Sequence, residues 1–265
     1  MSAELLQLGA VLLAAGAFAL RARTLARRGR HVRPLHAAFF SAGLAVVVCA
    51  FVSPLDRLGE ERFFSAHMAQ HLLLGDLGPL LVVLGLHGAL LRPLLALPAV
   101  GRLRALAHPA VALPVWAANL YLWHLPPLYD AALAHDVVHA LQHALFFTSG
   151  ALLWSALVEP LPGPAWFGPG WKALYSLCAG ALGGALANVF IWSTSVHYPR
   201  YPSLTDQRLG GALMLLEGAA VTLTAFSWFF LRWMRDAEAR ERLLQEGHDP
   251  AAVARALRYG RLVLK

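Results

Sequence analysis

The sequence predicts an all-α membrane protein, a polytopic bundle of seven transmembrane helices. Its 265 residues are 58% hydrophobic and only 14% charged, whereas soluble domains average about 45–50% apolar and about 25% charged residues. Seven apolar runs approach the roughly 20 residues that a helix needs to cross a bilayer. The 22 Lys and Arg residues lie outside these runs or at their edges. The helices would use almost the whole chain, which leaves no room for a separate soluble domain.

The apolar runs differ in how clearly each one predicts a helix. They cover 4–20, 35–53, 63–87, 109–124, 137–158, 172–193 and 209–231. The fourth run is short and contains Pro109 and Pro114, so its ends are the hardest to place. The third contains Asp76, Gly78 and Pro79, and this combination predicts a kink or break within the membrane.

The basic residues predict the orientation because they alternate between successive loops. Segments 21–34, 88–108 and 159–172 and the tail from 232 together hold 18 of them, and the opposite loops hold 4. The positive-inside rule then puts the N-terminus outside and the C-terminus in the cytoplasm of a bacterial cell. We expect residues 1–234 to form the transmembrane domain. Residues 235–265 should form a basic amphipathic tail on the inner leaflet, divided at His248-Asp249-Pro250.

The net charge of +7 would suggest nucleic acid as a partner of a soluble protein. Here the arginines flank apolar runs, so orientation and contact with anionic lipid of the bilayer explain them, and we expect no nucleic-acid partner. Cys49 and Cys178 stand alone in apolar runs, which does not favour a thiol-based metal or redox site. Gly180, Gly183 and Gly184 permit close helix packing, either within the chain or in a homodimer.

Histidines gather on the predicted outer side of the membrane. His67 and His71 are four residues apart, so their rings share one face of the third helix. His135, His139 and His143 repeat this spacing on the fifth helix, with His135 at or before its start. Two such pairs on facing helices would bring several imidazoles to one depth. Helices commonly bind transition metals in this way, and the sequence therefore predicts a metal site here.

Other residues near these pairs are weaker candidates for metal ligands. Met68 has a soft thioether that would favour Cu(I), but the helical turn moves it off the face shared by the histidine pair. His124, where the fourth helix emerges outside, would complete the site or bind metal at its entrance. His197 is plausible only as a ligand from an outer loop.

Two acids within the apolar runs, Asp76 and Glu217, require an explanation because charged groups in a membrane are costly. Asp76 lies five residues inward of His71. From there it would balance the charge of a metal or orient a metal-binding histidine. The alternative for both acids is a protonated side chain that bridges two helices.

Three segments resemble the CtaG-like assembly factors of caa-type cytochrome c oxidase. They are SPLDRLGEERFFSAHMAQHLLLGDLGPLLVVLG with its H-M-x-x-H element, WHLPPLYDAALAHDVVHALQHALFFTSGALLW with its H-x-P-x-x-Y-D start, and TDQRLGGALMLLEG with its D-Q-x-x-G-G block. They occur in family order over roughly residues 35–234. The resemblance implies a plasma-membrane protein that helps assemble the oxidase by handling copper. It assigns the metal to His67, Met68, His71, His124, His135, His139 and His143.

Three functions remain in competition at this stage. The leading hypothesis is a protein without enzymatic activity that takes copper from an extracytoplasmic donor and passes it to an oxidase subunit. The second is a haem-binding electron carrier, which the short spacing of the histidines and their position near one surface disfavour. The third is a metal or proton transporter in which Asp76 and Glu217 continue the path inward.

Overall fold

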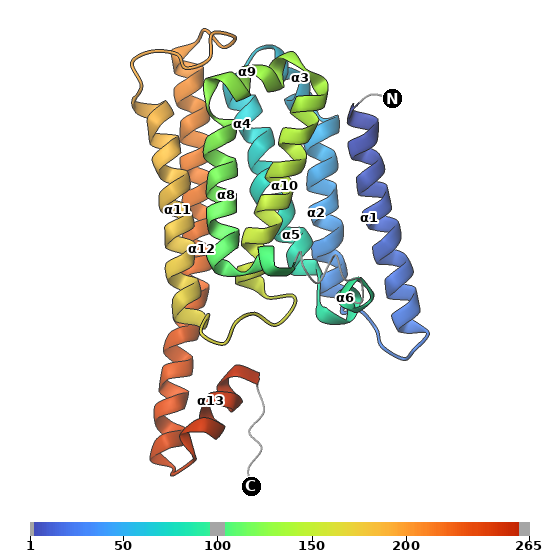
Figure 1. Ribbon diagram of the computed structural model, residues 1–265, viewed down its shortest axis with the longest axis vertical. Coiled ribbons are helices and arrows are strands. Elements are labelled where there is room, and N and C mark those ends of the chain that lie inside the picture. Colours follow the sequence, from blue (N-terminus) through green and yellow to red (C-terminus); the bar gives the residue numbers. More distant parts are fainter. Residues whose placement is uncertain (1–2, 96–103, 260–265) are drawn as a thin grey trace.

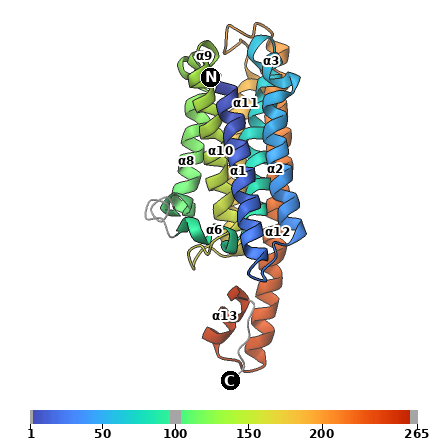
Figure 2. The same ribbon diagram turned by 90° about the vertical axis from the view of Figure 1, so that its right-hand side faces the viewer.

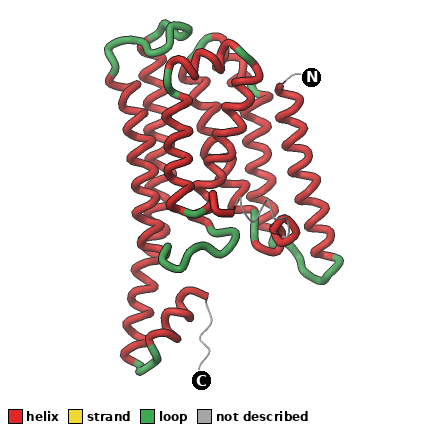
Figure 3. Tube along the Cα trace, in the orientation of Figure 1, coloured by secondary structure: helices red, strands yellow, loops and turns green. Residues whose placement is uncertain are grey.

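The computed structural model describes residues 3–95 and 104–259, and within these ranges every regular element is a helix (Figures 1 and 3). The predicted all-α class is therefore confirmed for the described residues. Six helical spans are long and apolar enough to cross a membrane, which makes this a multi-pass membrane protein. The spans are Leu5–Ala26, Pro34–Val52, Phe64–Gly85, Asp136–Val158, Pro169–Trp192 and Leu204–Gln245.

The helical elements follow the predicted runs, with short helices at the connections. The first half of the chain forms α1 (Ala3–Ala26), α2 (Pro34–Val52), α3 (Pro54–Glu61), α4 (Phe64–Leu72), the π-helix η1 (Leu73–Leu77), α5 (Gly78–Gly85) and α6 (Gly88–Leu95). The second half forms η2 (Arg104–Ala107), α8 (Pro109–Trp123), α9 (Pro126–Ala134), α10 (Asp136–Val158), α11 (Pro169–Trp192), α12 (Leu204–Gln245) and α13 (Pro250–Tyr259).

The fourth predicted run forms α8, which is only 15 residues long. Its start is set by His108, whose ring accepts a hydrogen bond from the Ala110 amide, and by Pro109 at the first helical position. At 1.5 Å per residue it extends about 22 Å, less than the roughly 30 Å of a hydrocarbon core. α8 packs beside α10 in the bundle, but among residues 3–95 and 104–259 six spans are long and apolar enough to cross, so the predicted count of seven is not confirmed.

The predicted irregularity in the third run is a π-helical turn. α4 passes into η1, and α5 then begins with Pro79 in its first turn. Proline cannot donate the usual backbone hydrogen bond, and its ring crowds the preceding turn. Single π turns of this kind occur within otherwise regular helices and often mark functional sites. Here the turn carries Asp76.

Glycine allows the central helices to approach closely. A Cβ atom on Gly150 of α10 would overlap the carbonyl oxygen of Gly75 in η1. A Cβ atom on Gly180 of α11 would likewise overlap the side chain of Thr222 in α12. Gly180 therefore serves packing within the chain, and a homodimer stays a prediction.

The two ends of the bundle differ in what they carry. The N-terminal end of α1 lies at the same end as α3 and α9, whereas α6 and α13 lie at the opposite end (Figures 1 and 2). α12 continues without interruption to Gln245, past the domain boundary predicted at residue 234. The chain then turns, as the His248-Asp249-Pro250 sequence predicts, and α13 begins at Pro250.

Candidate metal centre

Five buried histidines from α4, α8 and α10 meet near the end of the bundle that carries α3 and α9. The ring centroids of His67 and His71 are 4.2 Å apart, and those of His139 and His143 are 4.1 Å apart. The two pairs face each other. The ring centroids of His67 and His139 are 5.3 Å apart, and those of His71 and His143 are 5.5 Å apart. His124, directly after α8, lies 6.5 Å from His71.

Three of these side chains are arranged as a set of metal ligands would be. His67, His71 and His139 each offer a ring nitrogen, and the three nitrogens lie within 4.8 Å of one another. Within residues 3–95 and 104–259, neither nitrogen of His71 has a hydrogen-bond partner, and the same holds for Nε2 of the other two. A buried polar group without a partner costs about 1–3 kcal/mol. These free nitrogens at one point therefore fit a bound metal ion, and the arrangement is poorly explained by packing alone.

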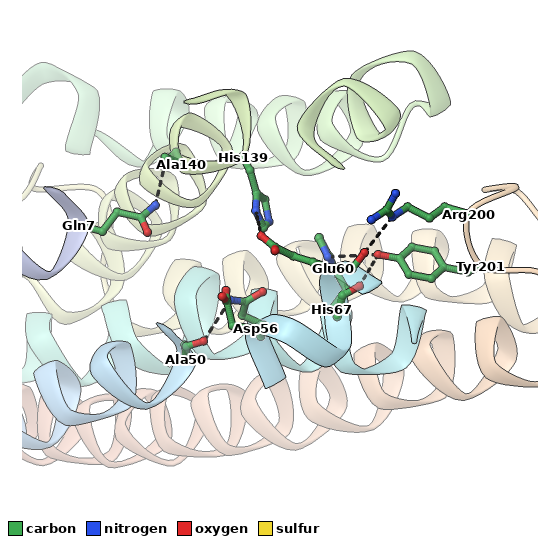
Figure 4. A network of polar contacts seen from close by, with 11 residues as sticks. Gln7, Ala50, Asp56, Glu60, His67, His139, Ala140, Arg200 and Tyr201 are labelled. Atoms are coloured by element: carbon green, nitrogen blue, oxygen red, sulfur yellow. Dashed lines mark hydrogen bonds and ion pairs between the residues drawn. The ribbon is translucent and has the colours of Figure 1, made fainter. Parts of the chain in front are cut away.

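A carboxylate from α3 orients one of these imidazoles. Oε1 of Glu60 lies 2.8 Å from Nδ1 of His139 (Figure 4). When Nδ1–H donates to this carboxylate, Nε2 is left with a lone pair directed to the histidine cluster. The hydrogen bond with His139, helped by the nearby charge of Arg200, lowers the pKa of Glu60, so this group is ionised at neutral pH. The Arg200 Nε also donates to the Glu60 backbone carbonyl at 2.8 Å.

Sequence reasoning missed Glu60 because it lies between apolar runs, where periodicity gives no information. Its neighbour Glu61 is chemically identical, and the sequence alone offers no way to choose between them. The usable signal was proximity, since Glu60 precedes His67 by only seven residues. The register of α3 determines that Glu60, and not Glu61, faces His139. Ser53 fixes the start of this helix by accepting a hydrogen bond from the Leu55 amide.

Tyrosines pack against the cluster. The Tyr201 hydroxyl donates to the Gly59 carbonyl and lies 3.5 Å from Nδ1 of His67. Tyr198 stacks on Tyr129 at 3.8 Å and donates to the His124 carbonyl at 2.7 Å. These side chains are all buried. They keep water from the imidazoles, and so strengthen any electrostatic interaction within the site.

Three other predicted ligands lie beside the central three. His143 and His124 are buried, and Nε2 of each has no hydrogen-bond partner in the described part of the chain. The Nδ1 atom of His124 is already used, 2.7 Å from the Leu120 carbonyl oxygen. Met68 is only 1% exposed and packs in the aromatic cluster with Phe64 and Tyr129.

His135 and His197 lie apart from this cluster. His135 is exposed and precedes the first residue of α10, with an extended backbone. It therefore does not continue the helical spacing that relates His139 to His143. The half-buried His197 packs against Phe190, with ring centroids 5.4 Å apart. The geometry favours the buried histidines as ligands over these two.

Asp76 and Glu217 meet in a cavity of about 100 Å³ that also reaches His71, His124 and Met68. Oδ1 of Asp76 accepts a hydrogen bond from Nε1 of Trp154 at 2.6 Å. Glu217 of α12 lines the same cavity as Asp76. The hydrogen bond from Trp154 joins η1 to α10, and it favours the helix-bridging role for Asp76.

We expect Asp76→Asn to retain copper binding and to reduce stability. The amide oxygen can still accept from Trp154, but the substitution replaces a carboxyl group that shares a cavity with Glu217. The thermal midpoint should fall by about 2–4 °C for each kcal/mol lost, while copper affinity stays close to that of the unaltered protein. Thermal unfolding and copper titration of the purified variant measure both. A drop in affinity of about tenfold or more would instead show that Asp76 supports the metal.

A multi-pass helical bundle with a buried histidine cluster near one end is a membrane protein with a candidate metal site. The chain belongs to the cytochrome c oxidase caa3 assembly factor family, Caa3_CtaG, since a sequence model of that family matches residues 16–236. This confirms the resemblance found in the sequence.

Two relatives have no assigned function. An uncharacterized protein of Mycobacterium bovis (strain ATCC BAA-935 / AF2122/97) and one of Mycobacterium tuberculosis (strain CDC 1551 / Oshkosh) are each 28% identical over 172 residues. The alignment covers 58% of this chain but only 25% of either relative. No solved structure matches the chain.

Proposed function

We propose that this protein is a non-enzymatic copper-binding assembly factor of the bacterial plasma membrane, which helps deliver or insert copper into a haem–copper cytochrome c oxidase. Membership of the assembly-factor family supports the role in oxidase assembly. The copper proposal rests on the convergence of His67, His71 and His139, whose ring nitrogens lie within 4.8 Å of one another. The partners would be oxidase subunits and a copper donor outside the cytoplasm.

The side chains available suit copper, although they do not bind it exclusively. Imidazole binds copper, zinc, iron and nickel, and Cu²⁺ is the most strongly held of the divalent ions in such sites. Cys49 and Cys178 are exposed and outside the cluster, so the site would hold copper through nitrogen. His143 lies 5.5 Å from His71, so copper could leave by exchanging one imidazole for another.

The geometry gives less support to a haem carrier. Pockets for ligands of drug size or larger usually measure about 300–1,000 Å³, whereas the cavity next to His71 and His124 measures about 100 Å³. The aromatic side chain of Phe146 also lies beside His71, with ring centroids 4.7 Å apart. A haem could bind to His71 from this side only if Phe146 moved away.

Oxidase assembly in cells tests the proposed function. Cells that lack this protein should assemble an oxidase with its haem but with depleted copper, and the unaltered gene should restore the copper-to-haem ratio. His139→Ala should fail to restore it, because that variant removes one of the central nitrogens. His135→Ala is the matched control and should restore it, since that residue is exposed. Full copper content in cells without the protein would contradict the proposal.

The orientation is tested separately, because delivery outside the cytoplasm requires the histidines to face outward. The 18-to-4 distribution of basic residues motivates the expectation. A reporter that is active only outside the cytoplasm should work when fused after Ala134 and fail when fused after Lys265. The reverse pattern would place the histidines at the cytoplasmic side.

A further inference from the structure

A second apolar groove lies at the end of the bundle away from the histidines, where α1 runs beside α2 and α6 (Figure 2). It has a volume of about 520 Å³. Its walls include Ala17, Phe18, Phe40, Leu86 and Leu90. Phe18 stacks on Phe40 with ring centroids 4.1 Å apart. Apart from this contact, α1 lies at the periphery of the bundle, and the most apolar stretch of its membrane span has no buried residue.

The groove has a basic side chain in its wall. Nη2 of Arg21 donates to the Ala89 carbonyl at 2.8 Å, which fixes the guanidinium in place. Its Nε is buried and has no hydrogen-bond partner in the described ranges. A guanidinium that is fixed at one nitrogen and free at another is suited to binding an oxyanion.

Two histidine rings lie next to this wall, and acidic side chains are missing from the sequence around it. His36 is one helical turn before Phe40, and its ring lies 5.1 Å from that of His87. Burial, together with the nearby His36 and Arg30, lowers the pKa of His87. The sequence has no Asp or Glu from residue 5 to 55 or from 77 to 129, and these ranges contain every residue that lines the groove. An anion placed here would meet no acidic side chain among the residues that line the groove.

We propose that this groove binds an anionic phospholipid, with an acyl chain along Phe18, Leu86 and Leu90 and the headgroup phosphate against Arg21. The apolar walls and the guanidinium match the two parts of such a lipid. The groove also opens on a peripheral membrane span, where lipid is the surrounding solvent. The bound lipid would fill the space between α1 and the rest of the bundle, and so hold α1 in place. This inference does not depend on copper binding.

Native mass spectrometry of the full chain in mild detergent tests the proposal, with phosphatidylglycerol and phosphatidylcholine as probes. The unaltered protein should retain phosphatidylglycerol in preference to phosphatidylcholine, and Arg21→Gln should reduce that preference by about fivefold, the effect of one basic side chain near an anionic headgroup. Arg27→Gln is the matched control, since this exposed arginine does not line the groove. Equal retention of both lipids by the unaltered protein, or an unchanged preference in Arg21→Gln, would overturn the proposal.

A second pair of variants tests the acyl-chain part without changing any charge. Ala17→Phe places a ring in the groove and should reduce retention of phosphatidylglycerol. Ala19→Phe adds the same ring to the same helix at an exposed position outside the groove and should leave retention unchanged. Equal retention in the two variants would overturn the groove as the binding site, even if Arg21→Gln failed to fold.

Discussion

Replacing both His71 and His139 with alanine is expected to remove most of the copper from the purified protein. The double variant deletes two of the three imidazoles whose nitrogens lie within 4.8 Å of one another. The loss should exceed the roughly 10–100-fold drop in affinity that follows removal of a hydrogen-bond partner behind a metal ligand. Copper content per chain after purification in copper-supplemented medium measures the effect.

The matched control is the double variant His135→Ala, His197→Ala, which removes the same number of imidazoles from outside the buried cluster. It should retain its copper. Circular dichroism and size-exclusion chromatography of both double variants distinguish loss of a ligand from loss of the fold. Unchanged copper in a folded His71→Ala, His139→Ala protein would remove these two residues from the site.

Replacing Glu60 with alanine is expected to weaken copper binding by about 10–100-fold. The carboxylate lies 2.8 Å from Nδ1 of His139 and holds the tautomer that leaves Nε2 free. Glu60→Gln should fall at the lower end of this range, because its amide oxygen can still accept the hydrogen bond. Glu61→Ala is the control, since that neighbouring glutamate is exposed. Equal affinities in the Glu60 and Glu61 variants would contradict the orienting role.

The pH dependence of copper binding separates this carboxylate from the imidazoles. The hydrogen bond from His139 lowers the pKa of Glu60 below its ordinary value of 4.5. Its contribution is therefore fully present above pH 4.5 and is lost only as the pH falls through the lowered value. A loss of copper between neutral pH and pH 4.5 would therefore not come from Glu60, because its carboxylate is still charged in that range.

The sequence predicted the parts of the site that helical geometry determines. A spacing of four places His67 beside His71, and the same rule pairs His139 with His143, so two facing helices suffice to bring them together. The rule does not extend to His135, which was predicted at or before the helix start, because α10 begins only at Asp136 and the preceding backbone is extended. Periodicity cannot reveal where a helix starts when the residues around the start are mixed in character.

The contributions of the connecting segments could not be predicted. Glu60 and Tyr201 come from segments without periodicity, and they reach the cluster only through tertiary packing. The surroundings of Asp76 could not be predicted from the sequence for the same reason, since Trp154 and Glu217 belong to helices distant in sequence. Hydropathy, in contrast, located α8 closely, because the short run predicted at 109–124 agrees with the helix Pro109–Trp123.

Joint analysis of bound metal and haem in the purified protein tests the central claim most directly. Elemental analysis gives the metal content, and a reduced-minus-oxidised visible spectrum of the same sample gives the haem content. The arrangement of His67, His71 and His139 predicts stoichiometric copper without stoichiometric haem. Stoichiometric haem in a sample that contains no copper would contradict the account.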